Sequence, residues 1–77
     1  MGQQINPYIH WDKEIHHGRA CFTGTRVPLY IVLELLEAGE TPEEILKDYP
    51  RLTLKHVQAA LHFAAETLKN TEYPLVA

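Results

Sequence analysis

Two short amphipathic segments, each beginning at a threonine, constrain the fold of this chain more than any other feature. The first opens with Thr41-Pro42-Glu43-Glu44, which places a hydroxyl at the N-cap, proline at the first helical position and a glutamate where it closes a capping box. A Tyr49-Pro50-Arg51-Leu52 turn follows it. The second segment begins at Thr53 and carries an apolar stripe at steps of three and four, made of Leu54, Val57, Leu61, Ala64 and Leu68. The pattern predicts a helix-turn-helix whose second helix turns this stripe inward.

Upstream of this pair, the sequence predicts one more helix and a small β element. The helix is expected from about Pro28 to Ala38, and Gly39 follows it at the position that favours a left-handed residue. Residues 8–11 and 20–22 are rich in β-formers and predict a hairpin or a strand pair. The expected fold is therefore mostly α: a three-helix helix-turn-helix domain preceded by a short N-terminal β hairpin or strand pair. We expect a single domain, 1–77, with a β element and loop over 1–27, the helices over 28–69 and a tail over 70–77.

Chain length favours a second copy as a partner. A chain of 77 residues buries a modest core, and a strip of two strands has open edges that invite pairing. We therefore predict a homodimer formed through the β element. The interface residues expected there are Tyr8, Ile9, Trp11 and Phe22. Trp11 has two interpretations that stay open, an anchor on an edge strand or a lid over the helices.

Composition indicates a cytoplasmic globular protein. Hydrophobic residues make up 45% of the chain and charged residues 22%, and the longest apolar run is too short to span a bilayer. The chain shows no signal-peptide pattern, and the single cysteine, Cys21, is interpreted as a small packing residue. The five histidines are not spaced as a metal site, and no catalytic constellation or phosphate cradle is present. We expect no metal, no cofactor and no enzymatic activity.

A DNA-reading face is predicted near the start of the second helix of the pair. The residues expected to meet a major groove are Thr53, Lys55, His56, Gln58, Ala59 and His62. Gln58 can pair with adenine, Lys55 can reach guanine or phosphate, and the Thr53 backbone amide can meet a phosphate. The net charge of −3 argues against DNA, although residues 49–69 carry three bases against one acid. The alternative is a protein-interaction module without DNA contact, favoured by the four acids and four bases of residues 41–69.

Two motifs carry a resemblance to a known family. The segment Gly24-Thr25-Arg26-Val27-Pro28 and the segment Tyr49-Pro50-Arg51-Leu52-Thr53 stand in an order, over about residues 8 to 65, that resembles domain of unknown function family 433. The resemblance implies a homeodomain-like fold and a VapB-like antitoxin encoded beside a toxin with a PIN-type ribonuclease fold. Such an antitoxin would bind operator DNA, neutralise the toxin and repress its own operon. Either Arg26 or Arg51 could reach a carboxylate cluster of the toxin, and the sequence does not choose between them.

Overall fold

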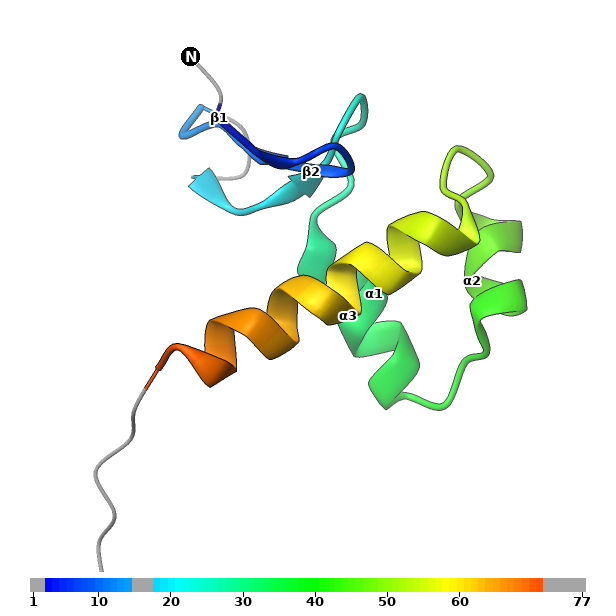
Figure 1. Cartoon of the computed structure of the whole chain (residues 1–77). Helices are drawn as coiled ribbons and strands as arrows, with labels where there is room; N and C mark the ends of the chain where they lie inside the picture. The colour runs from blue at the N-terminus through cyan, green and yellow to red at the C-terminus, as the bar shows by residue number, and fades with distance from the viewer. Residues whose placement is uncertain (1–2, 15–17, 72–77) are drawn as a thin grey trace, which may run out of the picture.

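The computed structural model describes residues 3–14 and 18–71, with side chains from residue 6 onward (Figure 1). Three helices follow a small antiparallel sheet, which confirms the predicted fold class. The elements in chain order are β1 (Gln3–Asn6), β2 (Ile9–Trp11), β3 (Cys21–Phe22), α1 (Leu29–Glu37), α2 (Pro42–Asp48) and α3 (Leu54–Lys69). Among the described residues, no helix combines the length and the apolar character needed to cross a bilayer. Most of the predicted tail, residues 72–77, lies outside the described residues.

The sheet has the order β1-β2-β3, so β2 is its central strand. Ile9 pairs with Phe22 on one side, and β1 pairs on the other side with Gln4 opposite His10. The placement of Trp11 on an edge strand was therefore wrong, because the sequence pattern did not reveal β1. That strand has the sequence Gln-Gln-Ile-Asn, and such a mostly polar sequence is more typical of a loop. Asn6 then turns the chain, its side-chain oxygen accepting the Tyr8 N–H at 2.8 Å.

Helix α1 is tied to the sheet at its beginning. The Leu29 N–H donates to the Ala20 carbonyl at 3.0 Å, and the Phe22 N–H donates to the Val27 carbonyl at 3.0 Å. These bonds and the bridge between Cys21 and Pro28 place residues 27–29 along β3. The predicted helix end is confirmed. Gly39 has φ +96°, and the N–H groups of Gly39 and Glu40 each donate at 3.0 Å to carbonyls of the last turn, as in a Schellman motif.

Helix α2 begins with the predicted capping box. The Glu44 N–H donates to the Thr41 hydroxyl at 3.2 Å, and the Thr41 N–H donates to the Glu44 carboxylate at 2.8 Å. This backbone hydrogen bond from Thr41 lowers the pKa of the Glu44 carboxyl, because it stabilises the charged form. Pro42 occupies the first helical turn. Local side-chain chemistry thus fixes where α2 starts.

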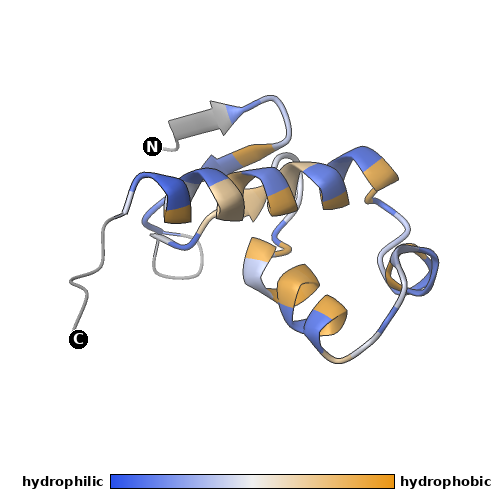
Figure 2. Cartoon of the chain, turned by 60° about the horizontal axis from the view of Figure 1, so that its bottom comes forward, coloured by the Kyte–Doolittle hydropathy of each residue, from blue (hydrophilic) through white to orange (hydrophobic). Residues whose placement is uncertain are grey.

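The core joins the sheet to all three helices. Its buried members are Ile9, Phe22, Leu29, Val32, Ile45, Leu52, Val57 and Ala60. Apolar bands recur along α1 and α3 in Figure 2. Cys21 is buried beside this cluster, and burial raises the pKa of its thiol, so the predicted packing role is confirmed.

The predicted inward stripe of α3 was partly wrong. Val57 is buried, but Leu54, Leu61 and Leu68 keep 50%, 48% and 58% of their surface exposed. The inner face of the helix is centred between Val57 and the fully buried Ala60, so the three leucines lie on its flank. Helix α3 packs against both α1 and α2, and a side chain larger than alanine at the fully buried position 60 would need space that a close-packed core does not hold. Sequence periodicity identified the apolar stripe but did not show which part of it faces the core.

Candidate nucleic-acid interface

The first half of α3 brings four of the predicted DNA-reading residues together. Lys55, Gln58 and His62 are exposed, and Ala59 is half-buried between them. All four line a shallow depression of about 390 Å³, whose other wall is the β1–β2 turn at Asn6, Pro7 and Tyr8. Steps of three and four residues keep Lys55, Gln58 and His62 on one side of the helix. Their surface is thus continuous and includes a turn that the sequence analysis did not assign to it. Asn6-Pro7 was the available signal, since this dipeptide marks turns.

His56 does not belong to this surface. Its Nδ1 accepts the Thr53 N–H at 3.0 Å and lies 2.9 Å from the Thr53 hydroxyl. Its ring meets Tyr8 edge to face at 5.2 Å between centroids, and Phe22 in the same manner at 5.7 Å. His56 therefore stands where the glutamate of a capping box would stand, and it packs the start of α3 against the sheet. Its prediction as a base-reading residue is corrected.

The same hydrogen bond changes the role predicted for Thr53. The Thr53 side chain is exposed at the start of α3, but its backbone N–H is already donated to the His56 ring. A phosphate at this position could not receive that N–H without displacing His56. The predicted amide contact is thus corrected, and the hydroxyl is the exposed polar group of Thr53.

The residues predicted for a dimer interface are mostly internal. Ile9 and Phe22 are completely buried within a single chain, so neither can contact a second copy, and the prediction for them is corrected. Tyr8 packs against the core and the His56 ring. Trp11 is half-buried and lines a depression with Gly18, Ala20 and Phe63, an arrangement that fits the lid interpretation. The apolar residues of a short strand can be recognised from the sequence. Ile9 and Phe22 were assigned from the sequence to an interface between copies, whereas they belong to the core of a single chain.

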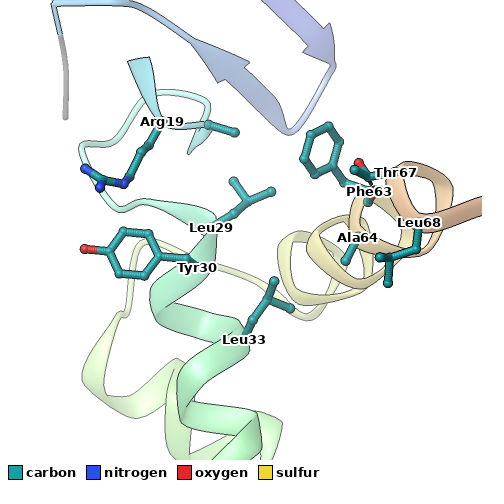
Figure 3. Close-up of a pocket in the computed structure, with 9 residues that line it drawn as sticks. Arg19, Leu29, Tyr30, Leu33, Phe63, Ala64, Thr67 and Leu68 are labelled. Carbon is teal, nitrogen blue, oxygen red and sulfur yellow. Dashed lines mark hydrogen bonds between the residues drawn. The ribbon is translucent and has the colours of Figure 1, made fainter. Parts of the chain in front are cut away.

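A second surface lies along the other half of α3. An apolar groove of about 520 Å³ separates α1 from the end of α3, and side chains of the two helices face one another across it in Figure 3. Its lining residues are Arg19, Ala20, Leu29, Tyr30, Leu33, Phe63, Ala64, Thr67 and Leu68. The Arg19 guanidinium lies over the Tyr30 ring, 5.7 Å from its centroid. The sequence did contain a signal for this groove. Apolar side chains surround most of α1, and the core covers only part of that circumference, so some of them remain at the surface.

Three helices follow a small antiparallel sheet, and the third helix has an exposed polar face, so the architecture is that of a small three-helix domain with an N-terminal sheet. The chain belongs to the family described as Protein of unknown function (DUF433), whose model matches residues 9–64. The matched range includes β2, β3, α1, α2 and most of α3. The predicted family membership is confirmed. No curated protein and no solved structure matches the chain significantly.

Within the described residues, no group of three or more histidine, cysteine, aspartate or glutamate side chains is placed to hold a metal ion. Acidic side chains gather instead on the first two helices, with Glu34 and Glu37 exposed on α1 and Glu43 and Glu44 exposed in the first turn of α2. The first two turns of α3 carry no acidic residue. The polar face of α3 is therefore less negative than the molecule as a whole.

Proposed function

We propose that this protein is the DNA-binding antitoxin of a type II toxin–antitoxin pair, which neutralises a PIN-type ribonuclease and represses its own operon. The observation that carries the DNA-binding part is the exposed row of Lys55, Gln58 and His62 on α3. Val57 and Ala60 anchor the opposite side of the helix in the core, so this row has a fixed orientation. A rigid helix that presents donors and acceptors near its N-terminus is the usual reader of a major groove.

The antitoxin part follows from the family resemblance, and the layout of the molecule supports it. An antitoxin that also represses must hold DNA and a protein at once. The polar face uses α3 residues between 55 and 62, whereas the apolar groove uses α3 residues between 63 and 68 together with α1. The two surfaces use different turns of the helix, so both ligands could be held together. We place this protein in the cytoplasm and expect it to act as a homodimer on half-sites about 34 Å apart.

A titration against DNA tests the proposal. Fluorescence anisotropy would compare the upstream DNA of its own operon with a scrambled duplex at two salt concentrations. We expect tighter binding to the upstream DNA and a steep loss of affinity as salt rises. Replacing both Lys55 and Gln58 with alanine should abolish the preference, whereas Lys69→Ala at the far end of α3 should preserve it. An unchanged preference in the double variant would refute the assignment of this face.

The groove favours a second candidate function, a protein-interaction module without DNA contact. Tyr30 and Leu68 keep 43% and 58% of their surface exposed at its rim, and a contiguous apolar surface of this kind commonly marks a protein contact. Absence of binding to any duplex, together with a partner lost on Leu68→Glu, would favour this function over the first.

A further inference from the structure

Three segments that are distant in the sequence meet in a polar notch beside the start of α3. Strand β2 contributes His10, the loop after β3 contributes Gly24, Thr25 and Arg26, and the turn between α2 and α3 contributes Arg51. The notch has a volume of about 480 Å³. Its lining residues include two arginines and a histidine and no acidic residue. We refer to it as the arginine notch.

His10, which lines the arginine notch, has a buried ring nitrogen that lacks a hydrogen-bond partner. The Nδ1 atom of His10 is buried, and no described residue of the chain forms a hydrogen bond with it. Buried polar atoms in folded proteins are nearly always satisfied, by the protein or by something bound to it. A small shift of the His10 ring that exposed Nδ1 to the notch would let an oxygen-bearing ligand satisfy this atom when Nδ1 carries a proton.

The loop that forms one wall is held in place by its own bonds. The Thr25 hydroxyl donates to the Phe22 carbonyl at 2.8 Å and accepts the Val27 N–H at 3.1 Å. Gly24 has φ +79°, and a Cβ added there would meet nothing within 4 Å. The backbone at Gly24 is therefore open to close approach by a ligand, while the bonds of Thr25 keep the wall fixed.

We propose that the arginine notch binds a phosphate group of the DNA backbone while α3 lies in the major groove. A guanidinium matches the geometry of phosphate oxygens, and the imidazole of His10 lines the same notch. Arg51 precedes Lys55 by four residues and lies in the turn that leads into the reading helix. Contacts from groups that flank a reading helix fix its register on the duplex. Arg26 is already engaged in an interaction within the chain, so the proposal depends on Arg51 and His10.

This proposal rests on the proposed DNA binding, so its first test uses inorganic phosphate instead of DNA. In a ¹H–¹⁵N correlation titration at constant ionic strength, phosphate should shift the amides of Gly24 and Thr25. Arg51→Ala should remove these shifts, and Lys69→Ala should leave them intact. Absence of the shifts, or their persistence in Arg51→Ala, would overturn the arginine notch as an anion site.

The second test measures duplex binding. Arg51→Ala should weaken binding to the upstream and scrambled duplexes by the same factor and reduce the slope of log affinity against log salt by about 1. An unchanged slope in a variant that has lost the phosphate shifts would assign the notch to an acidic protein surface and overturn the DNA assignment. If the unmodified protein binds no duplex, the proposed function and the DNA assignment fail together, while the phosphate titration still decides the anion site.

Discussion

Replacing His56 with alanine separates a structural role of this side chain from a DNA-reading role. The change removes the acceptor of the Thr53 N–H, and the loss of such a cap costs about 1 kcal/mol. It also removes two edge-to-face ring contacts, with Tyr8 and Phe22, each worth about 1 kcal/mol. Because the three contacts share one ring and are not strictly additive, we expect a loss of about 2–3 kcal/mol in the free energy of unfolding. That is a large fraction of the stability of a small domain.

Urea denaturation followed by circular dichroism would measure this loss. His56→Gln is the matched control, because glutamine at the same position can accept the Thr53 N–H but forms no ring contacts. It should retain the cap contribution and lose only the ring contribution, about 1–2 kcal/mol. Duplex affinity measured well below the unfolding transition should change much less in either variant than in the Lys55 and Gln58 double variant. A His56→Ala protein of unchanged stability and lost duplex binding would refute the capping role.

Four further outcomes test other parts of the fold and its surfaces. Ile9→Ala should lower the free energy of unfolding by about 2–5 kcal/mol in urea denaturation, because Ile9 is completely buried, and a near-neutral effect would contradict its place in the core. Gly39→Ala should cost about 1–2 kcal/mol by the same method, since φ there is +96°. The lowered pKa of Glu44 predicts a stabilising contribution that is present above its ordinary value of 4.5 and is lost as pH falls through the lowered pKa. Melting temperatures from about pH 7 to about pH 3 should show a smaller decline in Glu44→Gln than in the parent protein. Leu68→Glu should leave the circular dichroism spectrum unchanged and reduce any self-association seen by sedimentation equilibrium, because Leu68 lines the apolar groove and is 58% exposed.

The helix boundaries were predictable because their signals are local. Thr41 and Glu44 are three residues apart, and Gly39 directly follows the last turn of α1, so each boundary depends on a few neighbouring residues. Strand β1 was missed for the opposite reason. Its polar sequence acquires strand conformation from pairing with β2, which a local pattern does not encode.

The candidate sites depended on tertiary structure to a greater degree. Lys55, Gln58 and His62 share a face through helical spacing alone, so the sequence could group these three, but it also grouped His56 with them. The inward position of His56 is set by Tyr8 and Phe22, which are more than thirty residues away in the chain. The arginine notch also depends on a long-range contact, of the loop at Gly24 with the turn at Arg51. Sequence periodicity alone therefore predicts neither the inward position of His56 nor the arginine notch.

The hydrogen bonds that tie the start of α1 to β3 also close the β3 edge of the sheet. The Phe22 N–H and the Ala20 carbonyl, which would otherwise pair with a further strand, are occupied by residues 27–29 of the same chain. Pro28 stands in that stretch and has no N–H to offer a neighbour. Strand addition, whether by a partner or in aggregation, is therefore restricted to the β1 side among the described residues. An affinity tag fused ahead of Gln3 would lie next to this edge, so binding and aggregation assays are better made with untagged protein.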